Sequence, residues 1–430
     1  MNILLIGSGG RESALAWKII QSKNTTELYI TPGNAGSSNY GIQLSIAETD
    51  FESIGKFCVE KNIELVVVGP ETPLALGIFD YFKASPILKD ILIIGPSQEA
   101  AQLESSKDYA KEFMIRHHIP TAAYQTFTEE NIHEGYTFIE QLNPPYVLKA
   151  DGLAAGKGVV IVNTAEEAKL TLADFLLDHK LGSSGNKVVI EEFLSGIECS
   201  MFVLTDGKDY LLLPNAKDYK RIGEQDTGLN TGGMGSISPV PFVTKSFEDK
   251  VINQVILPTL KGIQEEKLNY CGFIFFGIIK VNDEPFVIEY NVRMGDPETE
   301  SVMPRIESDL VEHMTAAAKG ELYKEQIKIS DDATATVMLV AKGYPEAYSK
   351  GDIIEINAEI TSNSSLFFAG VSKNERGENI TSGGRVIAVT SKGTTIQEAL
   401  EKSYETIHHI KFSGMNFRKD IGYEFVNNKS

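Results

Sequence analysis

The chain has 430 residues, of which 42% are apolar and 23% charged, and its formal net charge is −19. This length and composition are typical of a soluble globular protein with about three domains, and the acidic charge excludes a general nucleic-acid-binding surface. Three cysteines, distant in sequence and without a Cys-x-x-Cys pair, indicate neither a disulfide framework nor a zinc site. No apolar run approaches the roughly 20 residues that span a bilayer, and no signal-peptide pattern is present, so we expect a cytoplasmic protein.

The first thirty residues predict the opening of a doubly wound α/β domain. A buried strand over Ile3–Ile6 runs into the glycine turn Gly7–Gly10, and a helix over Arg11–Ile20 and a strand over Glu27–Ile30 follow. A nicotinamide dehydrogenase begins in the same way. Here, however, Glu12 stands where a dinucleotide-binding turn has its third glycine, and no acidic residue ends the second strand. The turn therefore favours a single phosphate or ribose of a substrate.

Two more strands of this domain end in glycine–proline turns. Leu65–Val68 leads into Gly69-Pro70-Glu71, and Ile91–Ile94 leads into Gly95-Pro96-Ser97. Because doubly wound sheets bind ligands at the carboxyl ends of their strands, Glu71 is a candidate substrate contact. A solvated loop carboxylate would give the same pattern. We expect the N-terminal α/β domain to span residues 1–103.

The stretch Lys149–Gly158, KADGLAAGKG, combines two lysines and three glycines between the apolar runs Tyr146–Leu148 and Val159–Val162. Backbone N–H groups beside two ammonium groups suit the phosphates of a nucleotide, although a plain β-hairpin would use such glycines as well. The stretch is not a Walker A loop, because only three residues separate Gly152 from Gly156 and a strand follows in place of a helix. A flexible hairpin would cover any phosphate bound here.

Two segments outside the hairpin complete a candidate nucleotide site. Ser106-Lys107 opens a helix that runs to about His118. The strand Val188–Ile190 leads into Glu191-Glu192-Phe193-Leu194, with Glu198 just beyond. A carboxylate and backbone groups at a strand end, beside apolar side chains, suit an adenine ring and ribose hydroxyls. A charged strand end without a ligand is the simpler alternative.

Residues 215–239, NAKDYKRIGEQDTGLNTGGMGSISP, contain five glycines and few apolar side chains, so we expect no regular structure. A long loop in a compact domain is usually functional or disordered. The charged residues Lys217, Asp218, Lys220 and Arg221 alternate in sign, which favours docking of an anionic substrate. A solvated linker would explain the glycines but not this alternation.

The segment Phe286–Arg293, FVIEYNVR, predicts a strand with Glu289, Asn291 and Arg293 on one face. Glu289 and Asn291 offer the hard oxygen ligands that magnesium prefers, and Arg293 could reach a transferring phosphoryl group. An exposed sheet face would look similar. The tight turn Gly295–Glu298 follows.

The remainder of the chain predicts a third, α+β domain after a polar connection at 320–332. Its strands are Thr334–Ala341 and Arg385–Thr390, and Thr395 opens a helix. The seven histidines form no metal-ligand pattern, so we assign them no chemistry.

Several motifs together resemble those of the phosphoribosylamine–glycine ligase family of the ATP-grasp superfamily, and the resemblance runs from residue 2 to about 424. In chain order they are GSGGRESALAWK, PGNAG, VVGPETPL, QLESSK, KADGLAAGKGV, EEFLSGIE, DTGLNTGGMG, EYNVRMGDPET, SGGRV and FRKDIG. The resemblance implies an N-terminal α/β domain, an ATP-grasp domain over 104–328 with a mobile lid at about 121–192, and a C-terminal α+β domain over 329–430.

The resemblance also implies a reaction and its reactants. It implies ATP with Mg²⁺ or Mn²⁺, the small-molecule substrates glycine and 5-phosphoribosylamine, and the products glycinamide ribonucleotide, ADP and phosphate. We expect a monomer without nucleic-acid or membrane partners.

The residues that the resemblance assigns fall into four groups. The nucleotide group comprises Lys107, Lys149, Gly152, Gly156, Lys157, Gly158, Glu191, Glu192, Phe193, Leu194 and Glu198. The substrate group comprises Gly9, Gly10, Glu71, Asp218, Lys220, Arg293, Asp296 and Pro297. Lys149 and Arg293 are the catalytic candidates, and Glu289 and Asn291 are the metal candidates.

The chain departs from the family pattern at three positions: it has Ser13 and Tyr219 where the family usually has His, and Leu229 where it usually has Pro. Ser13 and Tyr219 put in doubt any proton-transfer role that the family assigns to the histidines at these two positions. Two alternatives remain open. One is an ATP-grasp carboxylase directed at biotin or an aminoimidazole, and the other is a non-catalytic nucleotide-binding protein.

Overall fold

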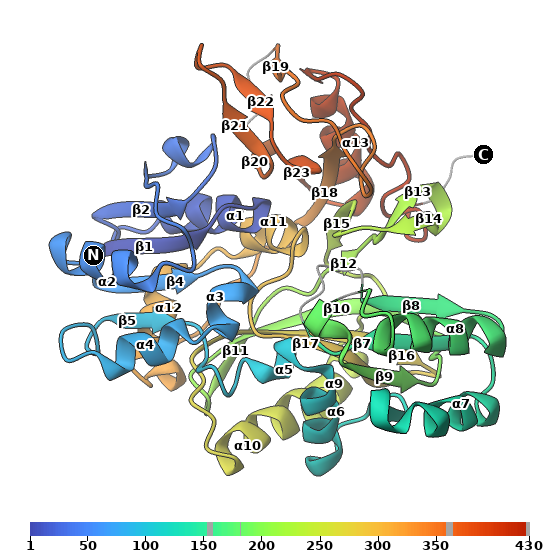
Figure 1. Cartoon of the computed structure of the whole chain (residues 1–430). Helices are drawn as coiled ribbons and strands as arrows, with labels where there is room; N and C mark the ends of the chain where they lie inside the picture. The colour runs from blue at the N-terminus through green and yellow to red at the C-terminus, as the bar shows by residue number, and fades with distance from the viewer. Residues whose placement is uncertain (153–157, 181, 358–363, 427–430) are drawn as a thin grey trace.

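The computed structural model describes residues 1–152, 158–180, 182–357 and 364–426, and Figure 1 shows three bodies arranged around a central sheet. The N-terminal body is blue, a body formed by residues 124–191 is cyan to green, and the C-terminal body is orange to red. Within the described ranges, no helix combines the length and the apolar character that crossing a bilayer requires.

Five parallel strands form the N-terminal sheet in the order β3-β2-β1-β4-β5. The strands are β1 (Asn2–Gly7), β2 (Glu27–Pro32), β3 (Ile42–Gln43), β4 (Leu65–Val68) and β5 (Leu92–Ile94), and the helices are α1 (Gly10–Ile19), α2 (Phe51–Glu60), α3 (Glu71–Ala75) and α4 (Ile78–Ala84). Ile3–Ile6 are fully buried, as expected for a strand covered on both faces. This order confirms the doubly wound prediction. The strand order switches between β1 and β4, because β2 and β3 lie on one side of β1 and β4 and β5 on the other. The Gly9-Gly10 turn follows β1 and Glu71 follows β4, so both lie at the crevice that such a switch point forms.

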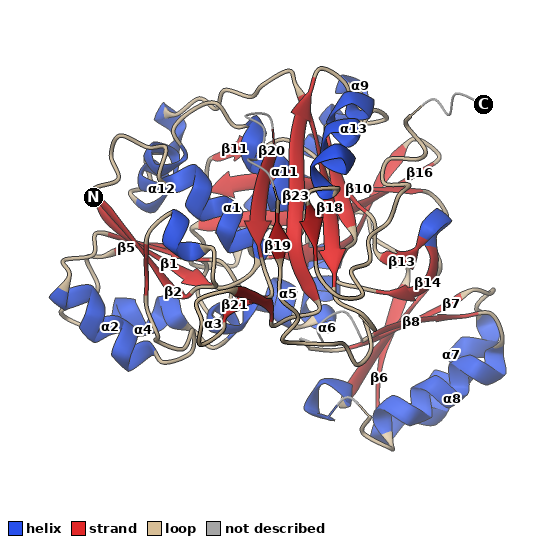
Figure 2. Cartoon of the chain, turned by 90° about the horizontal axis from the view of Figure 1, so that it is seen from above, coloured by secondary structure: helices blue, strands red, loops and turns tan. Residues whose placement is uncertain are grey.

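Residues 124–191 form a separate antiparallel sheet in the order β6-β9-β7-β8, which carries the segment predicted as a lid. Its strands are β6 (Tyr124–Thr128), β7 (Tyr146–Ala150), β8 (Val159–Val162) and β9 (Lys187–Glu191), and its helices are α7 (Ile132–Gln141) and α8 (Ala165–Leu176). A hydrophobic cluster of its own holds this body together, and Figure 2 shows it set apart from the rest of the molecule. The predicted hairpin is present as β7 and β8. Its tip, with Gly156 and Lys157, lies outside the described residues.

The central sheet is antiparallel in the order β11-β10-β16-β17. Its strands are β10 (Ile197–Thr205), β11 (Tyr210–Leu212), β16 (Gly272–Val281) and β17 (Glu284–Asn291). The helices of this region are α5 (Gln102–Ser105), α6 (Lys107–Arg116), α9 (Lys245–Val251), α10 (Leu257–Glu265), α11 (Glu298–Val302) and α12 (Leu310–Ala318). A π-helical turn joins α9 to α10. Strands β10 and β16 pair over nine residue positions, which makes this sheet the base on which the other bodies rest.

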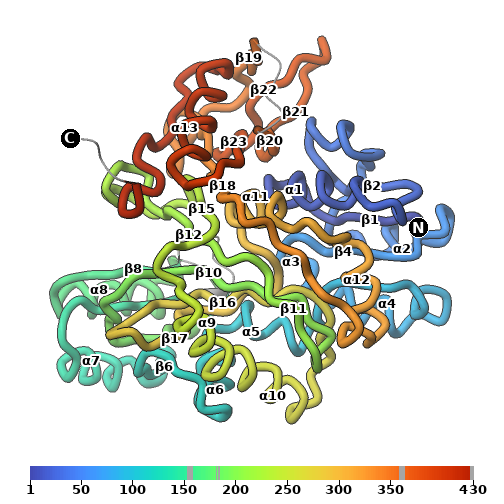
Figure 3. Tube along the Cα trace, turned by 180° about the vertical axis from the view of Figure 1, so that it is seen from behind, coloured from blue at the N-terminus to red at the C-terminus, as the bar shows by residue number. Residues whose placement is uncertain are grey.

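The expectation that residues 215–239 lack regular structure was wrong. They form β12 (Lys217–Asp218), β13 (Arg221–Gly223), β14 (Thr227–Asn230) and β15 (Gly235–Ser238). The physical reason is that backbone pairing needs no apolar pattern: β13 pairs with β14 and β12 with β15 inside the segment, and the second partner of β15 is distant in sequence. β15 bonds to β18 (Ala333–Val340), and both β12 and β15 belong to the C-terminal sheet, whose order is β12-β15-β18-β23-β20. Figure 3 shows β12 and β15 beside β18.

The rest of the C-terminal body follows the sequence prediction. The sheet is completed by β20 (Ser364–Phe368) and β23 (Arg385–Gly393), and α13 (Ile396–Ile407) packs on it after the N-cap Thr395. Two small ribbons, β19 (Glu355–Ile356) with β24 (Ile410–Lys411) and β21 (Val371–Lys373) with β22 (Asn379–Thr381), lie at its edge. Contacts of α1 with α11 and with β20 join the N-terminal body to the central region and to the C-terminal body.

Candidate functional site

A cavity lies where α6, β7, β9 and β17 meet, and it gathers many of the residues predicted from the sequence. Leu103, Ala110, Met114 and Ile288 give it apolar walls. A cavity with apolar walls and a few charged groups is the form expected of a small-molecule site. The predicted residues in its lining are Glu71, Lys107, Lys149, Gly152, Gly158, Glu191, Glu289, Asn291 and Arg293.

A buried charge triad lies on one side of this cavity. The Glu191 carboxylate at the end of β9 contacts the ammonium groups of Lys149 on β7, at 2.9 Å, and of Lys111 on α6, at 3.1 Å. Burial, and the like charge of Lys149, lower the pKa of Lys111 to about 8, although Glu191 opposes this shift. The triad fixes Lys149 at the cavity wall while leaving two positive charges against one carboxylate, which suits an incoming polyanion.

The first turn of α6 is tied to the start of the glycine-rich hairpin. Asp151 accepts hydrogen bonds from the backbone N–H groups of Lys107, at 2.5 Å, and Asp108, at 3.2 Å. The Lys107 ammonium donates to the carbonyl of Gly152 at 3.1 Å, and burial lowers the pKa of Lys107. The start of the hairpin loop at Gly152 and the side chains of Lys107 and Lys149 therefore lie at the wall of the same cavity.

Glu289 and Asn291, near the end of β17, remain the metal candidates. Burial opposes the charge on Glu289, but nearby cations outweigh that effect and hold its pKa below the ordinary value; they are Lys220, Lys149, Lys107 and Arg293. A charged carboxylate and an amide oxygen fit a hard divalent cation that takes its remaining ligands from phosphate oxygens. Among the described residues, no group of three or more His, Cys, Asp and Glu could hold a metal ion.

Arg293 links the cavity to the N-terminal crevice. β17 ends at Asn291, so Arg293 lies just beyond the strand in which the sequence placed it. Its guanidinium contacts Glu104 at 2.6 Å and Glu71 at 3.5 Å, and Glu71 lies 3.8 Å from Arg11 on α1. This chain of charges connects the metal candidates with the turn that begins α1.

The adenosine candidates lie at the end of β9, in the connection that follows and at the start of β10, and the structure gives them different surroundings. The Glu192 carboxylate accepts a hydrogen bond from the backbone of Ala123 at 2.9 Å. Leu194 is partly buried, and Phe193 is 42% exposed. Glu198 lies 3.5 Å from Lys220. Of this segment only Glu191 lines the cavity.

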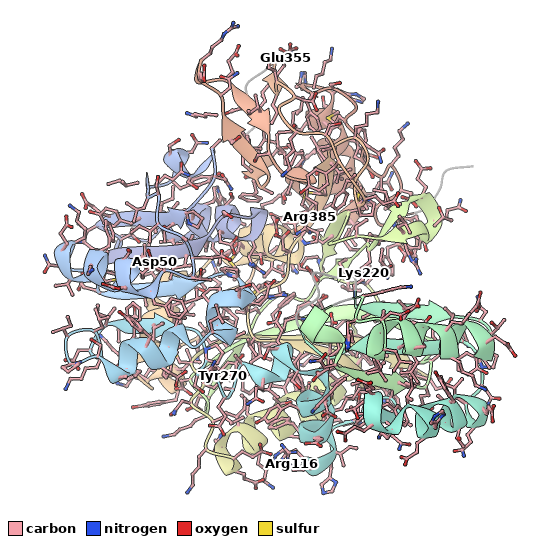
Figure 4. The ribbon with its side chains drawn as sticks, in the orientation of Figure 1. Asp50, Arg116, Lys220, Tyr270, Glu355 and Arg385 are labelled. Carbon is pink, nitrogen blue, oxygen red and sulfur yellow. The ribbon has the colours of Figure 1, made fainter. Side chains whose placement is uncertain are left out.

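Among the substrate candidates, Glu71 and Arg293 line this cavity, and the others lie outside its lining. A side chain at Gly9 would approach the Asp296 carboxylate to 3.2 Å, and one at Gly233 would meet Pro297 at 2.3 Å. Asp296 also forms an ion pair of 3.0 Å with Arg385. Figure 4 shows Arg385 where the bodies meet.

Asp218, Lys220 and Gly10 complete this group. The Lys220 ammonium lies 4.0 Å from the Asp218 carboxylate, and Figure 4 shows Lys220 beside the body formed by residues 124–191. Gly10 begins α1, and a side chain there would lie 2.3 Å from the buried carboxylate of Glu300. Glycine is therefore required by close packing at this turn.

A second cavity, of about 520 Å³, borders the same turn between the N-terminal and C-terminal bodies. Ser8, Asn34 and Ser382 line it with small polar groups, and Lys373 is the cation in its lining. Two sequence motifs, PGNAG and SGGRV, thus lie next to the Gly9-Gly10 turn.

The three departures from the family pattern occupy different environments. Ser13 is buried in α1 and donates a hydrogen bond of 2.5 Å to the carbonyl of Phe368. Tyr219 is buried against the C-terminal residues, with its hydroxyl on Glu424. Leu229 is half exposed on β14.

Three charged residues of the site were missed from the sequence: Lys111, Glu104 and Arg11. One signal could have found Lys111, because it follows Lys107 by four residues and so lies on the same face of a helix. Glu104 and Arg11 have no such signal, since their partners Arg293 and Glu71 are distant in sequence.

Comparisons with known proteins agree with this architecture. Three phosphoribosylglycinamide synthetase models match the chain: the N domain at residues 1–104, the ATP-grasp (A) domain at 105–299 and the C domain at 334–424. The phosphoribosylamine–glycine ligase of Pasteurella multocida is 44% identical over 429 residues, covering 99% of this chain and 98% of its own.

Solved structures give the same result. The crystal structure of phosphoribosylamine–glycine ligase from Thermotoga maritima superposes with a TM-score of 0.84 at 33% identity, covering 98% of this chain and all of that one. A biotin carboxylase from Campylobacter jejuni shares the fold at a TM-score of 0.75 with 15% identity, over 100% of this chain and 95% of its own. The chain therefore belongs to the phosphoribosylglycinamide synthetases, the family of the phosphoribosylamine–glycine ligases.

Proposed function

We propose that this chain joins glycine to 5-phosphoribosylamine through a glycyl phosphate intermediate. A glycine carboxylate oxygen attacks the γ-phosphorus of ATP, and the bond to the bridging oxygen breaks, which releases ADP. The amine of phosphoribosylamine then attacks the acyl carbon, loses a proton and displaces inorganic phosphate, leaving glycinamide ribonucleotide. The reaction is a step of purine biosynthesis and needs no nucleophilic side chain, because the acyl phosphate is itself an activated donor.

One observation carries this proposal: Lys107, Lys149, Glu289 and Arg293 line one cavity that reaches Glu71 at the switch point of the N-terminal sheet. The lysines and Arg293 match the charge that spreads over a transferring phosphoryl group. The ATP site thus adjoins the crevice where a doubly wound sheet takes its ligand.

For the nucleotide we propose contacts from Lys107, Lys149, Gly152, Gly158 and Glu191, and from the connection Glu192–Leu194 with Glu198. Gly156 and Lys157 are proposed as part of the loop that covers the phosphates. Glu191 acts here through its two lysines, which it holds at the cavity wall.

For the metal we propose Mg²⁺ or Mn²⁺ on Glu289 and Asn291. Held by Glu289 and Asn291, such an ion would neutralise the charge of the phosphate oxygens. Glu289 is held in its charged form by the surrounding cations, so it is ready to bind one.

For glycine and phosphoribosylamine we propose the side that contains Gly9, Gly10, Glu71, Asp218, Lys220, Arg293, Asp296 and Pro297. Support comes from the second cavity, which brings Lys373 and the polar groups of the PGNAG and SGGRV motifs to the same turn. An approach from this cavity would bring a ribose phosphate to the N-terminus of α1, whose dipole favours an anion.

Exclusion of water is the remaining requirement, because an acyl phosphate hydrolyses. We propose that residues 121–192 close over the cavity as a lid, which is supported by their separate hydrophobic cluster. We further propose domain bounds of 1–103, 104–328 and 329–430, a monomeric state and a cytoplasmic location.

The deciding experiment is ADP release measured with ATP and Mg²⁺, with and without glycine and phosphoribosylamine. The proposed function requires that release depends on both substrates. Release that depends on bicarbonate and not on glycine would favour a carboxylase. Binding of ATP without any substrate-dependent release would favour a non-catalytic protein.

A further inference from the structure

Residues 217–220 place alternate side chains in two different environments. The short strand β12 pairs with β15, so its successive side chains point to opposite faces. Asp218 and Lys220 lie close together on the face where Lys220 also contacts Glu198. Lys217 and Tyr219 both contact Glu424, near the end of the described chain. One short stretch therefore connects the substrate side of the site with the C-terminal residues.

The Tyr219 side chain is enclosed by charged groups of fixed geometry. It is 1% exposed, and its hydroxyl donates a hydrogen bond of 2.8 Å to the Glu424 carboxylate. The Lys217 ammonium lies 4.2 Å from the centre of the ring and 3.1 Å from the other oxygen of Glu424. The Arg418 guanidinium lies 5.3 Å from the ring centre. A hydrogen bond to a charged acceptor and two cation–π contacts hold the ring in one orientation.

The same C-terminal residues also hold the hairpin that follows Lys220. Arg418 contacts Asp226 at 2.6 Å and donates to the carbonyl of Arg221 at 3.2 Å. Asp420 accepts a hydrogen bond of 2.6 Å from the backbone of Gln225. Residues 417–424 are thus bound to both ends of the β13–β14 hairpin and to Tyr219 in front of it. Lys220 lies between these two attachments, and its backbone carbonyl accepts hydrogen bonds from Thr231.

We propose that Tyr219, held by Glu424, is a positioning residue that sets the place of Asp218 and Lys220 on the substrate side of the site. The proposal deepens the proposed function and rests on it. Tyr219 itself touches neither substrate. Tyr219 lies on one face of the stretch, and Asp218 and Lys220 lie on the other. Because all three share one backbone, holding the Tyr219 side chain also holds the backbone that carries Asp218 and Lys220.

This arrangement predicts a selective kinetic effect. The proposed nucleotide contacts on α6, β7 and β9 make no hydrogen bond or ion pair with Tyr219 or Glu424 in the described ranges, whereas Glu198 on β10 is reached by Lys220. Loosening Tyr219 should therefore weaken use of glycine and phosphoribosylamine more strongly than use of ATP. A merely structural role would affect all three reactants alike.

The test compares Tyr219→Phe, Glu424→Gln and the double variant, with each reactant varied in turn while ADP release is measured. We expect kcat/KM for glycine or for phosphoribosylamine to fall about tenfold in each single variant, the size of one charged hydrogen bond. The KM for ATP should stay within about twofold. The double variant should be no worse than the more impaired single variant, because both changes weaken the Tyr219–Glu424 hydrogen bond and only Glu424→Gln also removes the ion pair with Lys217.

A matched control is Tyr29→Phe, which removes the hydrogen bond from another buried tyrosine to a carboxylate, that of Glu27 on the same strand of the N-terminal sheet. Its kinetics should equal those of the unaltered protein. If Tyr219→Phe fails to fold, Glu424→Gln decides, since its partly exposed side chain tolerates an amide.

Three results would overturn the inference: unchanged substrate kinetics in folded variants, an equal rise in the KM for ATP, or additive effects in the double variant. Failure of the proposed function would look different, because the unaltered protein would then release ADP without dependence on glycine.

Discussion

Replacing Lys149 with methionine tests the central assignment of the site. Methionine keeps the apolar stem of the side chain and removes only the ammonium group, which contacts Glu191 at 2.9 Å. Glu191 keeps its second partner, Lys111, at 3.1 Å, so the carboxylate is not left buried without a cation. We therefore expect Lys149→Met to fold.

The expected loss of activity follows from the distance. A unit charge about 3 Å from a phosphate oxygen is worth roughly 6 kcal/mol at an effective dielectric constant of 20, before desolvation is subtracted. Part of this energy already binds ATP in the ground state. The share that grows in the transition state is about 3 kcal/mol, which corresponds to a ~100-fold fall in kcat.

The assay is ADP release at saturating ATP, glycine and phosphoribosylamine, with the fold checked by thermal unfolding. The control is Lys169→Met, which removes a lysine paired with Glu140 between α8 and α7, and it should retain full activity. Turnover of folded Lys149→Met within threefold of the unaltered protein would refute the assignment of Lys149 to the phosphates.

Three further predictions concern buried charges near the site. Glu289→Gln should lower kcat about 100-fold and raise the Mg²⁺ concentration needed for half-maximal activity, because the amide leaves the surrounding cations without their carboxylate; an unchanged Mg²⁺ titration would argue against a metal there. The pKa of Lys111 falls to about 8 from an ordinary 10.5, so the unfolded chain binds more protons than the folded one between these values. The stability of the protein relative to Lys111→Met should then rise by about 3 kcal/mol from pH 8 to 10.5 in urea unfolding, and a flat difference would contradict the burial of a charged lysine. Burial and the neighbouring Asp218 raise the pKa of Glu298 to about 8, so its stabilising contribution is complete below about pH 4.5 and is lost as the pH rises through 8. Stability relative to Glu298→Gln should fall by on the order of 5 kcal/mol over that range, whereas a difference that grows with pH would show that Glu298 is charged in the folded state.

The parts of the fold that the sequence predicted depend on local patterns. The buried strand Ile3–Ile6, the glycine turn after it and the helix start at Thr395 are each visible in a few consecutive residues. These features form from residues that are neighbours in the sequence, so the sequence alone predicts them. The same holds for the hairpin of β7 and β8, whose two apolar runs flank one glycine-rich turn.

The parts that the sequence missed depend on partners far along the chain. Strand β15 pairs on one side with β18, about a hundred residues later, although β12 pairs with β15 and β13 with β14 inside the segment 215–239. Glycine-rich residues show no strand pattern of their own. Likewise, Glu104 became a site residue only when folding brought Arg293 to 2.6 Å from it.

Strand β15 also determines how the chain can be divided. The sheet of the C-terminal body takes β12 and β15 from before residue 239 and its other three strands from after residue 332. A fragment ending at 332 would leave β15 with a bare edge, which invites association between copies. A fragment beginning there would lack two strands of its sheet. A chimera that takes its C-terminal domain from a relative should therefore also take residues 217–238 from that relative. The boundary of the ATP-grasp family model at residue 299 is not a point at which the fold can be divided.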